Sequence, residues 1–565
     1  MLFMAFFLKK AKQRNRIYLA IYESFYSPDT KGTKHKCIQS LGSVDKLKEQ
    51  GIDDPISFYQ QKVDEMNFEE KSKKERFNTR QISQEVPTVH LGYFPLANIL
   101  NTLDVETHFN WMQYLRKFDF SVYDIFSSLV YARAVAPHSK FKTFHDVLPN
   151  LYKNTDFSYD QLLSALEFIG SEYEKFIEIF TTATKENYSI DTSHTYFDCT
   201  NFYFEIDRED CFKMKGPSKE NQKTPIVGLG LLLDANMIPI GMRMYPGNES
   251  EKPVLRNIIN DLKNRNNISG RTVQIADKGL NCAKNIISAI QNNDGYIFSK
   301  SVKQLPKKEQ TWILLDHDYR NVYDEKGEIK YRIKSCVDQF TYSYKDDEGN
   351  IISKTITEKR ICTYNPKLAR KKLAEIEKMV LKAKNLSLYT AKKSEFGESG
   401  KYVNFTDSEG KKANVSINET AIEKDRAFAG YNMIITSEIK LNENKIYEAY
   451  HNLWRIEESF RIMKTDLDAR PVYLQKKERI IGHFLVCYVT VLLERIFQFN
   501  ILENKYSTST IFEFIKNFKV VQVNDNLYIN ITKASDFITD LSRITHHPLT
   551  NYYLNKKQIE KLHTR

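Results

Sequence analysis

Three acidic residues occupy positions at which a carboxylate could act in catalysis or bind a metal ion. Asp198 lies in the middle of the aromatic segment YFDCTNFYF, which continues well past it, so that a turn explains it poorly. Asp277 closes RTVQIAD directly before KGLN, where a strand of an open α/β sheet ends at a cleft. On neighbouring strands the two carboxylates would repel unless a divalent cation lay between them, and oxygen ligands suit Mg²⁺ or Mn²⁺. The ordinary alternatives are a solvent-facing strand residue for Asp198 and a cap or turn residue for Asp277.

The third acid belongs to the helix-forming run YHNLWRIEESFRIMKTDL, residues 450–467. A spacing of seven returns to nearly the same helix face, so Tyr450, Glu457 and Lys464 should share one stripe, while Glu458 points about 100° away. Arg461, four residues after Glu457, lies on the same side. The alternative is an exposed Glu457–Arg461 ion pair that contributes roughly 0.2–0.5 kcal/mol.

Together the three acids favour phosphoryl transfer. A carboxylate triad can hold two metal ions, one activating water or a hydroxyl and one stabilising the leaving oxygen. A tyrosine and basic residues on the same stripe could then hold neighbouring phosphates. Lys219, in the segment GPSKE, is either a flexible loop residue or a further phosphate contact. For Arg133 and Lys140, a solvated helix face and DNA binding both stay open.

Composition narrows the class of protein. The 83 Lys and Arg against 72 Asp and Glu residues give a net charge of +11, which suits a polyanionic partner, with nucleic acid the leading candidate. Seven scattered cysteines without a Cys-x-x-Cys pair argue against a disulfide framework and a zinc ribbon, and indicate a reducing compartment. The N-terminal apolar run and the segment 480–493 are both too short for a membrane span, so we predict an edge strand, a buried core helix and no membrane association.

Hydrophobic periodicity divides the chain into six segments. We predict a β-containing module with a linker (1–90), a helical region (91–190), a first part of an α/β core (191–300), a β-rich insertion domain (301–440), a second part of the core with the Glu457 helix (441–500) and a C-terminal helical region (501–565). Within the insertion, TWILLDH, YRIKSCV, FTYSYKD and IISKTITEKRICTY read as separate strands.

Several segments, in this order and spacing, resemble one enzyme family. They are VYARAVAPHSK, YFDCTNFYFE, GPSKE, YPGNES, IADKGLN, FAGYNMIITS and YHNLWRIEESFRIMKTDLDARPVYL. The chain resembles DDE transposases of bacterial insertion sequences, from the branch marked by a Tyr-Arg-Glu-Lys box and a β-strand insertion before the catalytic Glu. The resemblance implies an α/β fold with a ribonuclease H-like catalytic core interrupted by a β-rich insertion, and N-terminal β-containing and helical DNA-binding regions.

The resemblance also implies roles for individual residues. Asp198, Asp277 and Glu457 would be catalytic and would bind two Mg²⁺ ions, with Mn²⁺ able to substitute. Tyr450 and Lys464 would contact the DNA end. The arginine expected three residues after the tyrosine is Leu453 here; we expect Arg461 to compensate for the missing phosphate contact.

The implied partners are double-stranded DNA with terminal inverted repeats, target DNA and a second copy of the chain in a homodimer on paired ends. The implied location is the bacterial cytoplasm, in association with the nucleoid. Three alternatives stay open: a metal-dependent DNA nuclease without strand transfer, a catalytically silent DNA-binding protein derived from a transposase, and, with less support, a glycosidase that uses two carboxylates.

Overall fold

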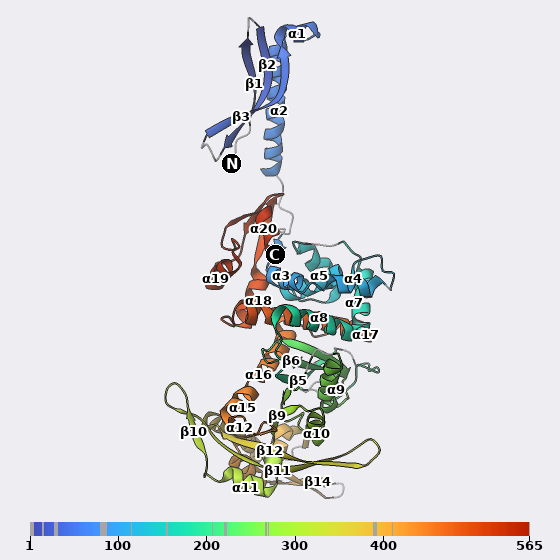
Figure 1. Ribbon diagram of the computed structural model, residues 1–565, viewed down its shortest axis with the longest axis vertical. Helices are drawn as coiled ribbons and strands as arrows, with labels where there is room; N and C mark the ends of the chain where they lie inside the picture. The colour runs from blue at the N-terminus through green and yellow to red at the C-terminus, as the bar shows by residue number, and fades with distance from the viewer. Residues whose placement is uncertain are drawn as a thin grey trace. The chain divides into compact units, whose positions relative to one another are not determined.

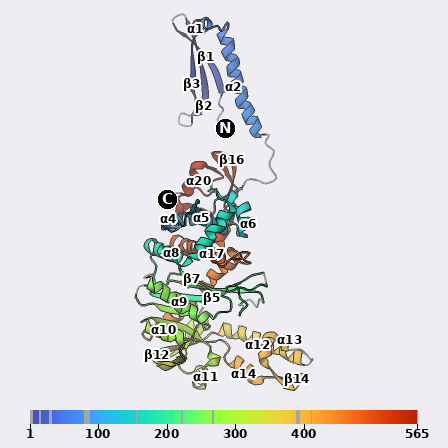
Figure 2. The same ribbon diagram turned by 90° about the vertical axis from the view of Figure 1, so that its right-hand side faces the viewer.

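A computed structural model of the chain describes residues 5–13, 16–27, 32–78, 88–114, 116–153, 156–205, 207–217, 219, 223–265, 268, 270–387, 393–408 and 411–563. The chain divides into two compact units, Met1–Val86 and Pro87–Arg565. Figures 1 and 2 show the elements of each unit in two views.

The first unit is an antiparallel sheet with helices after it. Its strands lie in the order β1 (Ala5–Gln13), β2 (Arg16–Ser27), β3 (Gly32–Ser43), and they lead into α1 (Val44–Glu49) and α2 (Pro55–Asn78). The predicted edge strand is confirmed as β1. The amide of Asn67, on α2, exchanges two hydrogen bonds of 2.9 Å with the backbone of Phe6, which satisfies polar groups that an edge strand would leave unpaired.

Residues 91–190 of the second unit are helical, as predicted. The helices are α3 (Phe94–Leu103), α4 (Glu106–Tyr114), α5 (Val122–Val135), α6 (Lys140–Lys142), α7 (Tyr159–Ser171) and α8 (Tyr173–Tyr188), with a π-helix η1 (Thr143–Val147) and a 3₁₀ turn η2 (Leu148–Asn150) between α6 and α7. Their apolar residues form one continuous core with the later helix α17 (Lys477–Ile496).

Helix α17 is the buried core helix predicted from 480–493, although the expectation that it is too short for a membrane is wrong. A π-helix, η6 (Phe497–Ile501), extends it, and Lys477–Ile501 is long and apolar enough to cross a membrane by length and composition. Its apolar window lies entirely inside the protein, where α17 packs against α3, α5, α7 and α8. Two glycines permit the close approach to α7, because an added Cβ would lie 1.7 Å from the Glu478 carbonyl oxygen at Gly170 and 2.2 Å from that of Leu166 at Gly482.

The centre of this unit is a nine-stranded mixed sheet with the order β10-β11-β12-β15-β9-β8-β5-β6-β7. Strands β7, β6 and β5 pair antiparallel, whereas β5, β8 and β9 run parallel. The strands of this core part are β5 (His194–Tyr203), β6 (Ile226–Leu233), β7 (Pro239–Pro246), β8 (Val273–Ala276) and β9 (Gly295–Lys300), with the predicted helices α9 (Glu251–Asn264) and α10 (Ala283–Gln291) between them. One face of the sheet packs on α9 and α10, and the other joins the core around α17.

Besides a separate two-stranded sheet, formed by Val403–Ser408 and Lys411–Ile417, the stretch 301–440 contributes four strands that continue the nine-stranded sheet. They are β10 (Arg320–Tyr323), β11 (Ile329–Lys345), β12 (Ile351–Tyr364) and β15 (Tyr431–Thr436), and β15 pairs with β9. Two predictions are wrong in detail. TWILLDH lies largely in the helix α11 (Lys307–Leu314), and YRIKSCV and FTYSYKD are parts of the single strand β11. A short apolar run is compatible with either element, and only the packing partner decides between them.

Two smaller groups of elements complete the unit. A satellite core is built from α12 (Pro366–Ser387), α13 (Lys393–Phe396), a 3₁₀ turn η4 (Gly397–Tyr402), β13 (Val403–Ser408), β14 (Lys411–Ile417) and α14 (Glu419–Ala427), and η3 (Val302–Gln304) precedes α11. The C-terminal helices α18 (Thr508–Asn517), α19 (Asp536–Thr545) and α20 (Lys556–Leu562) accompany a sheet of order β18-β17-β16-β4, with bounds Tyr553–Asn555, Leu527–Asn530, Lys519–Asn524 and Thr88–His90.

Candidate active site

The two candidate aspartates lie next to each other where the short strand β8 ends beside the middle of β5. Strands β5 and β8 are parallel neighbours, and their register ends with Phe197 opposite Ala276. Asp198 is the next residue of β5, and Asp277 directly follows the last residue of β8. The charge of Asp277 contributes to the raised pKa of Asp198. The pairing of β5 with β8 therefore brings the two carboxylate-bearing residues together, as the sequence predicted.

Asp198 is nearly buried and has a lysine beside it. Its side chain is 20% exposed, and the Lys219 Nζ lies 3.7 Å from Oδ1. The same ammonium lies 3.4 Å from Oε1 of Glu251 and donates to the carbonyl oxygen of Cys199. Burial raises the pKa of Asp198 to about 6; Lys219 opposes this rise, and Glu251 and Asp277 add to it. A carboxylate held this way favours a nearby cation, and Lys219 supplies one.

Asp277 is held by two hydroxyl groups. The Ser299 Oγ donates to its Oδ1 at 2.9 Å, and the Tyr450 hydroxyl donates to the same oxygen at 3.2 Å. Ser299 follows Phe298, which pairs with Ala276 on β8. The pKa of Tyr450 is raised, first by burial and then by the charge of Asp277, with a smaller contribution from Glu457. The phenol is therefore a neutral donor that orients Asp277.

The helix that carries Glu457 is broken, so the prediction of one continuous helix over 450–467 is wrong. Helix α15 (Glu443–His451) ends before α16 (Trp454–Arg461), which passes into the π-helix η5 (Ile462–Asp466). At the break the amides of Leu453 and Ile456 bond three residues back, to the carbonyls of Tyr450 and Leu453. A uniform period of 3.6 does not cross such a break, so the shared stripe does not follow from spacing alone.

Leu453 belongs to the hydrophobic core at this break. Its side chain is 7% exposed and packs with the apolar residues of the core around α17. Leu453 thus anchors the junction of α15 and α16 to the protein interior. An arginine at this position would have to bury its charge or move the junction.

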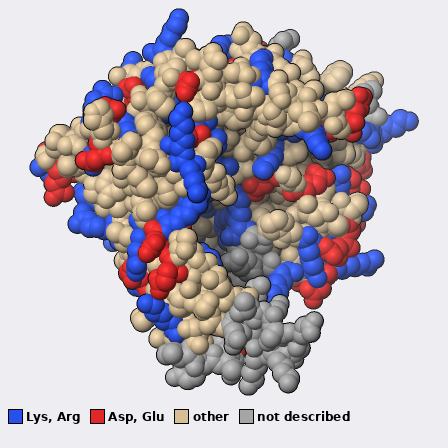
Figure 3. All heavy atoms as spheres, turned by 90° about the horizontal axis from the view of Figure 1, so that it is seen from below, with Lys and Arg blue, Asp and Glu red and all other residues tan. Residues whose placement is uncertain are grey.

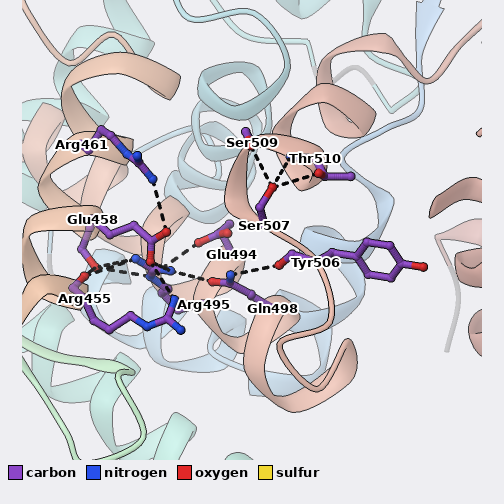
Figure 4. Close-up of polar contacts among 11 residues, drawn as sticks. Arg455, Glu458, Arg461, Glu494, Arg495, Gln498, Tyr506, Ser507, Ser509 and Thr510 are labelled. Carbon is purple, nitrogen blue, oxygen red and sulfur yellow. Dashed lines mark hydrogen bonds and ion pairs between the residues drawn. The ribbon is translucent and has the colours of Figure 1, made fainter. Parts of the chain in front are cut away.

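The structure separates the two adjacent glutamates of α16. Glu457 is exposed, and within the part of the chain that the structure describes it makes no ion pair. Glu458 is 10% exposed and pairs with Arg455 at 3.2 Å, Arg461 at 3.3 Å and Arg495 at 3.1 Å (Figure 4). The alternative pair Glu457–Arg461 is therefore wrong, because Arg461 points to Glu458.

A buried polar network ties α16 to α17 (Figure 4). Arg495 is fully buried, and its Nη1 donates to Oε1 of Gln498 at 2.6 Å and its Nη2 to Oγ of Ser459 at 3.2 Å. Glu494, also fully buried, lies 3.8 Å from the Arg495 Nε, and burial raises its pKa to about 7. The sequence analysis missed this network; its signal is the pair Glu494–Arg495 in an otherwise apolar run.

Lys464 reaches the same region from η5. Its Nζ lies 5.5 Å from the centre of the Phe202 ring on β5. Burial lowers its pKa to about 8; the charge of Lys219 lowers it further, and Asp198 opposes this effect. The charges of Lys219 and Asp198 therefore both act on Lys464, while Tyr450 contacts Asp277 and is close enough to Glu457 for its charge to raise the tyrosine pKa.

The donor chemistry around this edge fits a hard divalent cation. Asp198, Asp277 and Glu457 offer only carboxylate oxygens, the ligands that Mg²⁺ and Mn²⁺ prefer. As arranged, the described residues contain no group of three His, Cys, Asp or Glu side chains that could hold a metal ion. A cavity of about 400 Å³ adjoins Asp198 and is lined in part by Asn201, Lys219, Glu251 and Gly279. Glu251 is a fourth acid that the sequence analysis missed, directly after YPGNES.

Comparison with known proteins gives one family. The transposase DDE domain matches residues 193–493, more than half of the chain. The matched range begins just before β5, ends within α17 and contains the nine-stranded sheet and all three candidate acids. A search of the curated proteins finds no match to the chain. The chain therefore belongs to the transposase DDE domain family, which implies transposase activity on DNA.

Proposed function

We propose that the protein is the DNA transposase of an insertion sequence and that it cleaves and joins the ends of its element by two-metal phosphoryl transfer. Asp198, Asp277 and Glu457 would hold two Mg²⁺ ions, with Mn²⁺ able to substitute. The observation that carries this proposal is the adjacency of Asp198 and Asp277 on the parallel strands β5 and β8, inside the family match.

We also propose that the core is ribonuclease H-like. The order β7-β6-β5-β8-β9 supports this, since three antiparallel strands are followed by two parallel ones in one sheet. The proposed division into domains treats 191–300 and 441–500 as the catalytic core, and 301–440 as the β-rich insertion whose strands extend its sheet.

When bound, the metal ions would activate water or a 3′ hydroxyl and stabilise the leaving oxygen. Other residues of the chain orient the carboxylates that would bind these ions. Ser299 and Tyr450 fix one oxygen of Asp277. The ion pairs of Glu458 hold α16, so that Glu457 is presented from a fixed helix. Lys219 balances the charge of Asp198 and would turn to a DNA phosphate once divalent cations supply that balance.

For DNA contacts we propose Tyr450, Arg461, Lys464 and Lys219. Lys219 and Lys464 flank Asp198, and the Arg461 side chain is 63% exposed, so one side of its guanidinium remains accessible beside the Glu458 pair. On the face shown in Figure 3, Lys and Arg side chains are intermixed with Asp and Glu. Net charge therefore does not define a DNA path there, and the proposal depends on the residues at the site.

The proposed partners are duplex DNA with terminal inverted repeats, target DNA and a second copy of the chain, in the bacterial cytoplasm at the nucleoid. The unit Met1–Val86 and the helices of 91–190 are the proposed DNA-recognition regions. Strand β1 carries Lys9, Lys10 and Lys12, which suits contact with phosphates.

The test uses amide substitutions. Asp198→Asn, Asp277→Asn and Glu457→Gln should each abolish Mg²⁺-dependent cleavage of a duplex that carries the element end. Asp347→Asn is the matched control, because that side chain is 99% exposed in a turn of the insertion. Full cleavage by any of the three variants would refute the assignment of that residue.

A second assay separates the two enzymatic alternatives. A pre-cleaved end with a free 3′ hydroxyl, offered together with a target duplex, should be joined to the target by the wild-type protein. Cleavage without joining would favour the metal-dependent nuclease. Binding of the end without either reaction would favour a catalytically silent DNA-binding protein.

A further inference from the structure

A second cavity, of about 540 Å³, lies where α5, α6 and α17 meet the segment that follows η5. Basic side chains dominate its polar lining, which includes Arg133, His138, Lys140, Lys142, Asp468 and His483. Its volume falls in the range of small-molecule sites. None of these residues belongs to the proposed active site.

Arg133 lines the cavity from α5 and is 4% exposed. Its guanidinium donates to backbone carbonyls, at 3.2 Å to that of Leu467 and at 2.8 Å to that of His138. Among the described residues, no carboxylate lies within ion-pairing distance of it. Of the two readings left open for Arg133 in the sequence, burial excludes the solvated helix face.

Lys140 lies beside it and is 6% exposed. Its Nζ is 3.1 Å from Nδ1 of His483, whose Nε2 is 3.1 Å from the carbonyl oxygen of Ala469. Because that carbonyl can only accept, Nε2 carries the proton and Nδ1 accepts from the lysine. The histidine is thus a neutral acceptor and offers no negative charge to Lys140.

Two buried basic side chains, Arg133 and Lys140, therefore face one cavity, and neither makes an ion pair with the described residues. Burial of an unpaired charge is costly, and a charge that persists in such a place has a counter-charge nearby. The only carboxylate in the described lining is Asp468, which is exposed. Burial lowers the pKa of Lys140 well below its usual range, and Arg133 lowers it further. The charge of an anion in the cavity would oppose both effects and favour the protonated form of Lys140.

We propose that this cavity binds a phosphate group, held by Arg133 and Lys140, and that in the working protein the phosphate belongs to bound DNA. The second half of this statement rests on the proposed function; the first half does not. A phosphate offers several acceptor oxygens to a guanidinium and an ammonium at once. The hydroxyl of Ser139 and the side chain of Lys142 also line the cavity.

The position of the cavity links it to the Glu457 helix. Arg133 holds the carbonyl of Leu467, the residue directly after η5, and η5 follows α16 without a break. A DNA phosphate bound by Arg133 would therefore affect the position of the segment that carries Lys464. This gives a physical route by which one DNA contact supports the geometry of the other site.

The first experiment measures thermal unfolding of the full chain in inorganic phosphate and in chloride at equal ionic strength. We expect the wild-type melting temperature to be higher in phosphate, and Lys140→Met, which keeps most of the length of the side chain without its charge, to lose this difference. Lys175→Met is the control, because that lysine is exposed and pairs with Glu172. Equal melting temperatures of the wild type in the two salts would overturn the phosphate site without reliance on any variant.

The second experiment measures the affinity for an end-bearing duplex as a function of salt. Lys140→Met should weaken binding about tenfold and reduce the salt slope by about 1. Stabilisation by phosphate with an unchanged DNA slope would refute the DNA phosphate and leave a free anion as the ligand. Stabilisation by phosphate in a protein that never cleaves end-bearing DNA would refute the proposed function and leave the phosphate site standing.

Discussion

The raised pKa of Asp198 predicts that removal of its charge stabilises the metal-free protein. The carboxyl has a pKa near 3.8 when exposed and about 6 in the folded chain. Between these values the folded state binds more protons than the unfolded state, so stability falls as the pH rises through this window and stays low above it. Asp198→Asn removes this loss, because the amide has no charge to bury.

The expected magnitude follows from the shift. About two pKa units correspond to about 3 kcal/mol, and because 20% of the side chain is exposed, solvent screening reduces this figure. We therefore expect Asp198→Asn to be about 1–3 kcal/mol more stable than the wild type at pH 7.5 in a chelator, and equally stable at pH 4. Lys219 keeps Glu251 as a partner in the variant, which limits the opposing loss.

The assay is denaturant unfolding followed over pH, with and without Mg²⁺. Mg²⁺ should stabilise the wild type, by about 2.7 kcal/mol at a hundredfold excess over its dissociation constant, and should not stabilise Asp198→Asn. Asp347→Asn should behave as the wild type in both conditions. A variant that is less stable than the wild type in chelator at pH 7.5, or that gains equally from Mg²⁺, would refute this reasoning.

Three further predictions concern the support of the site. Tyr450→Phe removes the hydrogen bond to Asp277 and should slow cleavage about tenfold with unchanged unfolding; equal rates would show that Ser299 orients Asp277 alone. Arg495→Met leaves the buried Glu494 without its cation and removes one of the three arginines that pair with Glu458, so it should destabilise the chain by about 3–5 kcal/mol in denaturant unfolding; a second change, Glu494→Gln, should partly restore stability, and no restoration would contradict the role of charge. Gly170→Ala places a methyl group 1.7 Å from a backbone oxygen and should lower stability by about 1–3 kcal/mol or more; a melting temperature like that of the wild type would show that α7 can move away from α17.

The local elements around the site could be predicted from the sequence because their signals are local. Alternation and turn residues indicate β5 to β8, and the end of β8 at Asp277 follows from the break at KGLN. Once β5 and β8 are neighbours in the sheet, Asp198 and Asp277 must lie close together. The choice of Glu457 over Glu458 remains a prediction, and its supports are the exposure of Glu457 and the three ion pairs of Glu458.

Contacts between distant segments decided the rest. The break at Leu453 depends on an apolar pocket formed by other elements, and helical spacing cannot reveal it. Strand β15 joins β9 across more than a hundred residues, so the β-rich stretch extends the core sheet although its sequence resembles a separate module. Arg133 and Lys140 resemble solvated or DNA-binding residues in the sequence; only α17 and the segment after η5 bury them. Residue type determined what these side chains can bind, and tertiary packing determined which of them meet, because burial and charge balance depend on neighbours that lie far away in the chain.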